Sequence, residues 1–432
     1  TIDSRVTKKN NIFLTIKGKK NDGTKFISKA LERGAKYVIS SKNIKKYKKK
    51  TLKVKNEILF LKEFAFLKRE KTKAKIIAIT GSAGKTSLKN LIKYLLEKYG
   101  STLSSPKSFN NYLGVPLSLS QLHVKHKYAV FEVGMSKAGE INTLSSIISP
   151  EIGIITNVGE AHIENFNNLN GIANAKSEII NNIKKNGTLI LNRDDKYFKF
   201  FEKKGRLKYL NIISFGMSKK SDVHPVSISK RNEQNFCKIK VKNQIIKLKY
   251  KNLNIYNVIA ALALLSELNL NIKRVINSFK DYEPTEGRGK LYKIKRYNKN
   301  FNLIDESYNA NPLSMKQSIL NLSSLNNKSQ KYILLGDMLE LGNKSRTLHE
   351  NLSPIINHSK INKIFIHGEH IMNTYKNVNK NKRGNILQEK SDFKEILLPI
   401  LQNNDYLMIK GSNATGLKKI TENLTKGRIN AI

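Results

Sequence analysis

Short apolar runs alternate with amphipathic stretches through the middle of the chain. Residues 76–80, 128–133 and 152–156 are rich in β-branched and other apolar residues, as expected of buried parallel strands. Residues 138–148 and 171–183 carry the three-to-four-residue apolar spacing of helices. Strands that alternate with helices in this way predict an α/β fold with a doubly wound parallel sheet.

Both ends of the chain show the same alternation on a smaller scale. The pattern predicts a small N-terminal α/β unit, with strands at 11–16 and 37–40 and a helix at 26–33. It also predicts a C-terminal Rossmann-like sheet, whose strands lie at 302–304, 332–335, 363–366 and 406–409. Two further segments are distinctive. Residues 223–250 alternate polar and apolar positions, which indicates an antiparallel ribbon, and 257–268 form a strongly apolar helix. We therefore expect domains at 1–73, 74–289 and 290–432.

Composition supports a large, multidomain protein. The chain has 432 residues, of which 39% are hydrophobic, and no run approaches the roughly 18 apolar residues that span a membrane. We expect no membrane insertion. The single cysteine, Cys237, excludes an internal disulfide and a cysteine metal cluster, and it fits a reducing, cytoplasmic compartment. We expect Cys237 to be structural. Because the chain begins with Thr1, we expect its N-terminus to be trimmed or partial.

The charge is strongly positive. Lys and Arg number 79 against 33 Asp and Glu, which gives a formal net charge of +46. Such a field attracts nucleic acid, anionic lipid or phosphorylated substrates. Lysine is spread along the whole chain, however, and the densest run, residues 45–50, lacks any nucleic-acid-binding motif. We expect a solvated loop there and no nucleic-acid partner.

A phosphate-binding loop follows the first buried strand of the middle region. The sequence Gly81-Ser82-Ala83-Gly84-Lys85-Thr86 lies between this strand and a helix predicted at 87–97. Glycines let backbone N–H groups face phosphates, and the helix N-terminus favours negative charge. The lysine can neutralise the β- and γ-phosphates, and the threonine hydroxyl can bind Mg²⁺. This is the shorter G-x-x-G-K-T form, and it predicts nucleotide binding.

Polar residues at two neighbouring strand ends are candidate metal ligands. Glu132 ends the strand at 128–133, and His162 follows the strand at 152–156. Because the strand ends of a parallel sheet meet at one edge, Thr86, Glu132 and His162 could share one site. An ordinary loop histidine is an equally good interpretation of His162.

The motifs together resemble those of the Mur ligases. The phosphate loop and residues 155–162 (ITNVGEAH) are similar to those of the whole family. Residues 108–116 (SFNNYLGVP), 305–312 (DESYNANP) and 335–342 (LGDMLELG) resemble the branch that adds D-Ala-D-Ala. The similarity runs nearly end to end.

The resemblance implies a fold and a reaction. It implies a UDP-sugar-binding domain, a central ATPase domain and a C-terminal domain that closes over the site. ATP would phosphorylate the terminal carboxylate of UDP-MurNAc-tripeptide, and the amine of D-Ala-D-Ala would attack the acyl phosphate, in the last cytoplasmic steps of peptidoglycan precursor synthesis. It implies two Mg²⁺ ions, one on Thr86 and Glu132 and the other on His162 and a carbamylated Lys176. We expect a monomer.

The resemblance also assigns binding residues. Asn257 and Arg288 match positions that contact ATP, and either Asp305 or Glu306 matches the ribose contact. Residues that match substrate-binding positions are Ser4, Arg5, Asn110, Asn111, Tyr308, Asn309 and Asn311. The chain departs from the family at Tyr256 and Ala260, which flank the adenine contact, and at Asn413, where arginine is common.

Two alternatives remain at this stage. A sister ligase that adds the third amino acid, or folylpolyglutamate synthase, would share the phosphate loop and the acyl-phosphate chemistry. A basic NTPase that binds nucleic acid would instead explain the charge, and it predicts a steep salt dependence. The sequence leaves open whether the tripeptide ends in meso-diaminopimelate or lysine.

Overall fold

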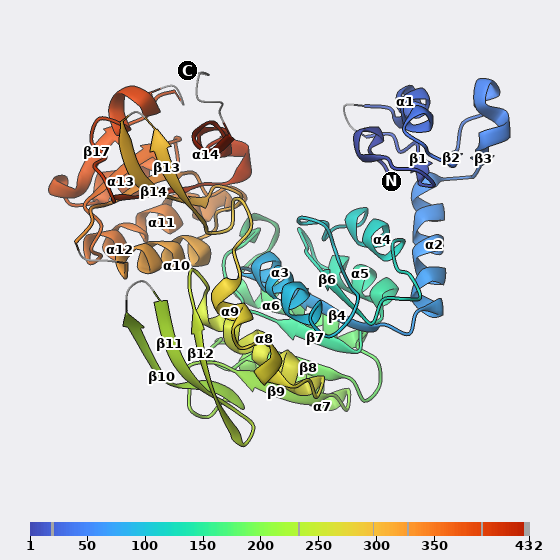
Figure 1. Ribbon diagram of the computed structural model, residues 1–432, viewed down its shortest axis with the longest axis horizontal. Helices are drawn as coiled ribbons and strands as arrows, with labels where there is room; N and C mark the ends of the chain where they lie inside the picture. Colours follow the sequence, from blue (N-terminus) through green and yellow to red (C-terminus); the bar gives the residue numbers. More distant parts are fainter. Residues whose placement is uncertain (19–20, 232–233, 297, 326–327, 390–391, 427–432) are drawn as a thin grey trace.

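The computed structural model describes residues 1–18, 21–231, 234–296, 298–325, 328–389 and 392–426. Its strands form three separate sheets, of three, nine and six strands. Figure 1 shows the three corresponding bodies, with the N-terminal unit standing apart from the other two at the end of a long helix. The α/β fold class predicted from the sequence is confirmed. The three sheets fall within the three predicted ranges, whose boundaries stay predictions.

The N-terminal unit is a small parallel sheet carried on a helix. Its strands, in the order β1-β2-β3, are β1 (Ile12–Leu14), β2 (Tyr37–Ser40) and β3 (Thr51–Lys53), with α1 (Ile27–Glu32) against them. Helix α2 (Glu57–Lys71) then leads to the central domain. Arg69, near its end, is buried and pairs with Glu151 at 2.9 Å. This buried contact fixes the base of α2 to the central domain.

The central sheet has the order β12-β11-β10-β9-β8-β7-β4-β6-β5. Strand β4 is buried along nearly its whole length, as its β-branched sequence predicts. The parallel strands are β4 (Lys75–Thr80), β5 (Thr102–Ser104), β6 (Tyr128–Glu132), β7 (Ile152–Ile155), β8 (Thr188–Asn192) and β9 (Asn211–Phe215). The predicted antiparallel ribbon is confirmed as β10 (Val223–Arg231), β11 (Gln234–Val241) and β12 (Gln244–Tyr250). It continues the parallel sheet, because β10 pairs with β9 through Val223 and Phe215.

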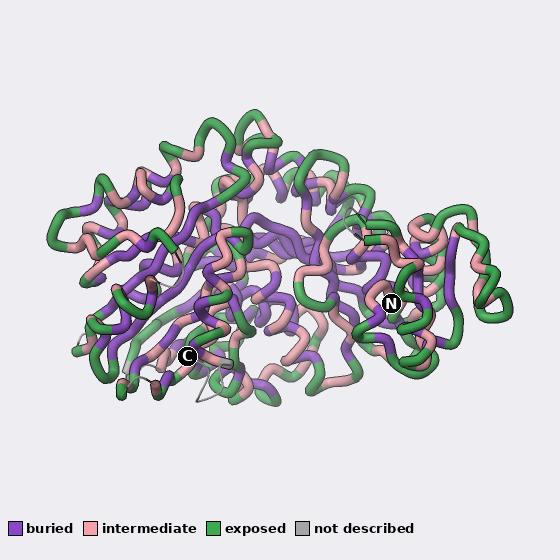
Figure 2. Tube along the Cα trace, turned by 90° about the horizontal axis from the view of Figure 1, so that it is seen from above, coloured by how far each residue is buried: buried purple, intermediate pink, exposed green. Residues whose placement is uncertain are grey.

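Helices cover both faces of the central sheet, and Figure 2 shows buried segments running through the middle of the molecule. The most apolar of them, α8, is buried from Asn257 to Leu265, which explains why its apolar residues are not confined to one face. The helices are α3 (Lys85–Leu96), α4 (Gly114–Leu119), α5 (Glu140–Ile148), α6 (Leu169–Asn181), α7 (Phe198–Leu207), α8 (Ile255–Glu267) and α9 (Ser278–Asp281).

The C-terminal sheet has the order β13-β14-β18-β15-β16-β17, and all its pairings are parallel except β13 with β14. The strands are β13 (Lys290–Arg296), β14 (Lys299–Glu306), β15 (Lys331–Gly336), β16 (Lys363–His367), β17 (Arg383–Ile386) and β18 (Tyr406–Lys410). The helices are α10 (Pro312–Ser323), α11 (Ser345–Glu350), α12 (Ser353–Asn357), α13 (Met372–Asn377) and α14 (Lys418–Lys426). Within the described residues, no helix is long and apolar enough to cross a bilayer.

Candidate active site

The phosphate loop lies between β4 and α3, and its glycines have conformations that other residues rarely adopt. Gly81 has a φ of +146°, and a Cβ atom there would lie 1.9 Å from Thr156 Oγ1. Gly84 has a φ of +82° and precedes the first residue of α3. Ser82 exchanges hydrogen bonds of 2.9 Å with the backbone of Gly159, on the loop that follows β7. The loop conformation is therefore braced by the neighbouring strand end.

Lys85 and Thr86 begin helix α3, next to the predicted phosphate loop. Lys85 Nζ donates to the carbonyl oxygen of Gly81 at 2.5 Å, so the side chain folds back over the loop. Thr86 Oγ1 donates to Glu132 Oε2 at 2.7 Å, and Asn110 Nδ2 donates to Glu132 Oε1 at 2.7 Å. The hydroxyl and the carboxylate that the sequence suggested as partners are in direct contact.

This pair suits a hard divalent cation. Mg²⁺ takes oxygen ligands and keeps several waters, so one carboxylate and one hydroxyl are sufficient when nucleotide phosphates supply the rest. Glu132 and Thr86 are both nearly inaccessible to solvent, which strengthens their attraction for a cation. Among the described residues, no group of three or more His, Cys, Asp or Glu side chains is arranged to hold a metal ion. A metal here would therefore depend on the nucleotide for part of its coordination.

His162 follows β7, and Lys176 lies on α6. His162 has a left-handed backbone, with a φ of +59°, and its Nδ1 lies 2.5 Å from Glu340 Oε2 of the C-terminal domain. Burial lowers the pKa of His162, and Lys85 and Lys176 add to this effect while Glu340 opposes it. Lys176, on α6, is almost fully buried, and burial together with nearby Lys85 lowers its pKa well below the usual value. Both groups are thus biased toward the neutral forms that bind metals or react with CO₂.

The C-terminal domain contributes a second wall. Asn311 caps α10 and donates from Nδ2 to the carbonyl oxygen of Ser82 at 3.3 Å, so α10 begins directly against the phosphate loop. Arg288 donates from Nη2 to Ser108 Oγ at 3.2 Å, and its guanidinium lies 4.4 Å from the ring centre of Tyr308. These contacts bring the predicted substrate loops of two domains together.

A single cleft of about 1560 Å³ runs between the two domains. That volume exceeds the range of about 300–1,000 Å³ for drug-sized ligands, and it leaves room for a nucleotide and a peptide together. The cleft is lined by most of the predicted site residues: Gly81, Ser82, Ala83, Gly84, Lys85, Thr86, Asn110, Asn111, Glu132, His162, Lys176, Asn257, Arg288, Glu306, Tyr308, Asn309 and Asn311.

Three predicted residues do not line this cleft. Asp305 is buried beside it, where Oδ2 accepts from Gly287 N at 2.7 Å and Oδ1 accepts from the backbone and side chain of Ser307. Its carboxylate is therefore committed to local backbone, whereas Glu306 faces the cleft. Ser4 and Arg5 belong to the N-terminal unit, where Arg5 is exposed and pairs with Asp3 at 2.8 Å.

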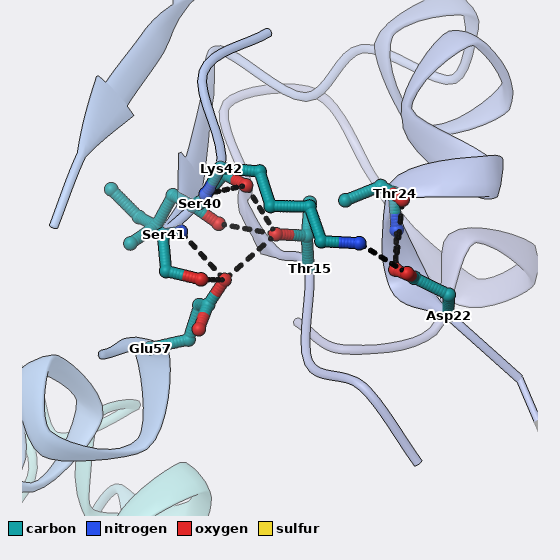
Figure 3. Close-up of polar contacts among 8 residues, drawn as sticks. Thr15, Asp22, Thr24, Ser40, Ser41, Lys42 and Glu57 are labelled. Carbon is teal, nitrogen blue, oxygen red and sulfur yellow. Dashed lines mark hydrogen bonds and ion pairs between the residues drawn. The ribbon is translucent and has the colours of Figure 1, made fainter. Parts of the chain in front are cut away.

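The N-terminal unit holds a polar cluster of its own (Figure 3). Asp22 accepts from the backbone N and the hydroxyl of Thr24 and from Lys42 Nζ, the last at 2.6 Å. Glu57 accepts from Ser41 and Thr15. The lysine and the backbone N–H hold the pKa of Asp22 far below its usual value. These bonds fix the segment around Asp22 and Gly23.

The cleft contains a residue that the sequence did not single out as a site residue. Lys410, at the end of β18, is almost fully buried, and its Nζ donates to Glu306 Oε2 at 3.3 Å and to the carbonyl oxygen of Asn309 at 3.1 Å. Burial lowers its pKa, and Glu306 opposes this effect. Its position in the sequence could have indicated this role, because Lys410 ends an otherwise apolar strand and is followed by Gly411 and Ser412.

Comparisons with known proteins agree with this geometry. Residues 79–265 match the Mur ligase middle domain, and residues 288–413 match the Mur ligase glutamate ligase domain. The UDP-N-acetylmuramoyl-tripeptide–D-alanyl-D-alanine ligase of Rickettsia prowazekii is 33% identical over 425 residues, which cover 97% of this chain and 93% of the relative.

Solved structures give the same result. A crystal structure of MurF from Acinetobacter baumannii aligns with a TM-score of 0.85 and 26% identity, over 98% of this chain and 92% of that one. MurF of Thermotoga maritima, solved with ADP, aligns with a TM-score of 0.83 and 23% identity over 98% of this chain and 96% of that one. The resemblance inferred from the motifs is confirmed: the chain belongs to the Mur ligase family.

Proposed function

We propose that the chain is an ATP-dependent ligase that joins D-Ala-D-Ala to UDP-MurNAc-tripeptide, giving UDP-MurNAc-pentapeptide, ADP and phosphate. The observation that carries the proposal is the cleft, in which the phosphate loop, Glu132 and the loops around Asn110 and Asn311 meet. The full-length similarity to a ligase of this name supports the choice of substrates. The reaction belongs to the cytoplasmic part of precursor synthesis.

The chemistry requires activation of a carboxylate. A carboxylate oxygen attacks the γ-phosphorus of ATP, the bond to the β–γ bridging oxygen breaks, and ADP leaves. The amine of D-Ala-D-Ala then attacks the acyl carbon, its nitrogen loses a proton, and phosphate leaves. Negative charge develops on the transferred phosphoryl group, so cations around it lower the barrier.

The chain's own residues supply this environment. The backbone N–H groups of the phosphate loop and Lys85 bind the β- and γ-phosphates, and Arg288 holds the loop at Ser108 across from them. Thr86 and Glu132 would hold Mg²⁺, which neutralises the phosphates when bound. Asn110 keeps the carboxylate of Glu132 oriented through its 2.7 Å hydrogen bond.

We extend the proposal to a second metal held by His162 and a carbamylated Lys176. The neutral amine of Lys176 attacks CO₂, a nitrogen–carbon bond forms and a proton is released, which replaces a cation by an anionic oxygen ligand. Burial and Lys85 favour that neutral amine. His162 Nδ1 faces Glu340, so Nε2 is the nitrogen available to a metal.

Product analysis tests the proposal. The protein is incubated with ATP, Mg²⁺, UDP-MurNAc-tripeptide and D-Ala-D-Ala, and the products are identified by mass spectrometry. We expect UDP-MurNAc-pentapeptide, formed from tripeptides that end in either meso-diaminopimelate or lysine if the cleft tolerates both. Extension of UDP-MurNAc-dipeptide by one amino acid would instead identify a sister ligase. No product, with ATP hydrolysis stimulated by nucleic acid, would favour the basic NTPase.

A further inference from the structure

Lys89 is a buried lysine for which the chemistry above has no use. It lies on α3, one turn after Thr86, and its side chain has no exposed surface. A buried ammonium is costly unless its donors are satisfied. Lys89 Nζ donates to the carbonyl oxygens of Ser105 at 2.5 Å and Lys107 at 2.6 Å. The side chain therefore ties the helix of the phosphate loop to the segment that follows β5.

The segment 105–110 needs such support. Lys107 has a φ of +46°, in the left-handed region that side chains other than glycine rarely adopt. The ends of the segment are also fixed, because Ser105 N donates to Val130 O at 3.1 Å and Gly134 N donates to Asn110 O at 2.8 Å. Between these ends, the ammonium of Lys89 binds two carbonyls on either side of Pro106. It holds the turn in a conformation that the backbone alone disfavours.

The segment in turn holds Glu132 through both its backbone N–H group and its side-chain carboxylate. Ser105 Oγ accepts from Glu132 N at 3.1 Å, and Asn110 Nδ2 donates to Glu132 Oε1 at 2.7 Å. The other carboxylate oxygen accepts from Thr86. Thr86 and Lys89 are one turn apart on α3, so the same helix reaches this carboxylate directly through Thr86 and indirectly through Lys89 and segment 105–110.

We propose that Lys89 is a positioning residue for Glu132: it fixes segment 105–110 and so holds the carboxylate in the orientation that binds Mg²⁺ beside the γ-phosphate. The inference rests on the proposed function and deepens it. Burial lowers the pKa of Lys89 to about 8, and Glu132 opposes the effect. At pH 7 the ammonium is therefore still protonated and able to donate to both carbonyls.

The test compares Lys89→Met with Lys331→Met. Lys331, at the start of β15, is a second buried lysine that is only 2% exposed and is not among the residues that line the cleft. Its Nζ donates to the carbonyl oxygen of Ser323 at 3.1 Å. Both substitutions remove a buried ammonium and keep the aliphatic volume. For each variant, kcat, the Mg²⁺ concentration at half-maximal rate and the melting temperature are measured. Residues that orient a metal ligand typically change affinity or activity by about 10–100-fold.

We expect Lys89→Met to lower kcat and raise the half-saturating Mg²⁺ concentration, each by roughly 10-fold or more. Lys331→Met should lower the melting temperature while both kinetic quantities stay within about twofold of wild type. A Lys89→Met protein whose Mg²⁺ dependence and kcat match those of Lys331→Met would overturn the proposal, because the lysine would then serve stability alone.

A second pair of variants keeps the test decisive if Lys89→Met does not fold. Lys89→Gln retains a neutral donor, and Ser105→Ala removes the contact with Glu132 N. Each variant should raise the half-saturating Mg²⁺ concentration. In the double variant this increase should be smaller than the product of the two single increases, because the two residues act in series. Independent, multiplicative effects would contradict the proposal. Wild-type inactivity would contradict the proposed function instead, and Mg²⁺-dependent ADP binding by calorimetry would then test Lys89.

Discussion

At the scale of single residues, Lys85 is the group that we propose to bind the phosphates of ATP most directly. Burial lowers its pKa and Glu132 opposes that effect, so a phosphate that displaces the carbonyl of Gly81 would give this half-buried lysine an ionic partner. We expect Lys85→Met to lower kcat by about 10²–10³-fold, the usual cost of losing one preorganised donor to a transition state. Steady-state phosphate release measures it. Lys93→Met, on the exposed side of the same helix, is the control, and a kcat of Lys85→Met within a few-fold of wild type would contradict the assignment.

Lys176 gives a prediction that depends on chemical modification. Its lowered pKa leaves more neutral amine at a given pH than an ordinary lysine has, so CO₂ can add to it near neutrality. We expect Lys176→Ala to lose most activity and to regain part of it with short carboxylic acids, which replace the carbamate oxygens. Because both proton loss and CO₂ are needed, wild-type activity should also fall in CO₂-free buffer, more at pH 6 than at pH 8. Unchanged activity of Lys176→Ala would contradict the carbamate.

Site residues could be predicted from the sequence where they belong to a short contiguous motif or to the end of a predicted strand. The phosphate loop, Glu132 and His162 were predicted from strand ends, and the structure places them along one cleft. Asp305 and Glu306 could not be separated, because alternation along β14 decides which one turns inward to Gly287. Lys89 and Lys410 were missed because a buried lysine resembles a solvated one in sequence. The spacing of Lys89 with buried Ile92 and Leu96 was the available signal.

At the scale of elements, the ribbon β10–β12 contains the only cysteine of the chain. Cys237 is buried, which agrees with its predicted structural role, and burial raises its pKa to about 12. At pH 8 its thiolate fraction should be about a thousandfold below that of an ordinary thiol. We expect a thiol reagent to label the native protein at least that much more slowly than the denatured protein, with the rate rising up to pH 12. Rapid native labelling would show that the ribbon opens or that the thiol is accessible.

Several buried parallel strands were predicted closely from the sequence. Residues 37–40 and 406–409 agree with β2 and β18 almost to the residue, because buried parallel strands are continuous apolar runs. Helix α2 was not predicted, since its long lysine-rich sequence buries only Leu61, Ala65 and Arg69. Its contacts with the central domain, such as Arg69 with Glu151, come from residues distant in the chain. Tertiary contact therefore defines this helix more than local pattern does.

At the scale of the whole molecule, polar contacts around the cleft join the C-terminal domain to the central domain. Glu340 faces His162 across this interface, with both side chains partly exposed. Glu340→Gln removes the charge that opposes the lowering of the pKa of His162, so this pKa should fall further. Because an ion pair between partly exposed side chains contributes little free energy, we expect kcat/KM to fall by no more than about fivefold. Steady-state kinetics measures this, and Glu350→Gln, which breaks an exposed pair with Arg346, is the control. A hundredfold loss would mean that Glu340 acts on substrate or metal directly.

The arrangement of the domains suits a long substrate. The N-terminal unit, with its polar cluster around Asp22, stands on α2 apart from the cleft in which the phosphate loop lies (Figure 1). We propose that a UDP-sugar peptide binds to the N-terminal unit by its nucleotide and places its terminal carboxylate in the cleft. The separation of these two parts could not be predicted from hydrophobic periodicity, because no local sequence pattern specifies how far the N-terminal unit lies from the phosphate loop.

Phosphate release from ATP is the most direct measurement of the central claim. UDP-MurNAc-tripeptide and D-Ala-D-Ala are supplied singly and together to the wild-type protein in the presence of Mg²⁺. A ligase that works through an acyl phosphate should release phosphate continuously only when both substrates are present, with one pentapeptide formed per phosphate. A rate of phosphate release that does not change when both substrates are added, or that rises with nucleic acid instead, would contradict the account.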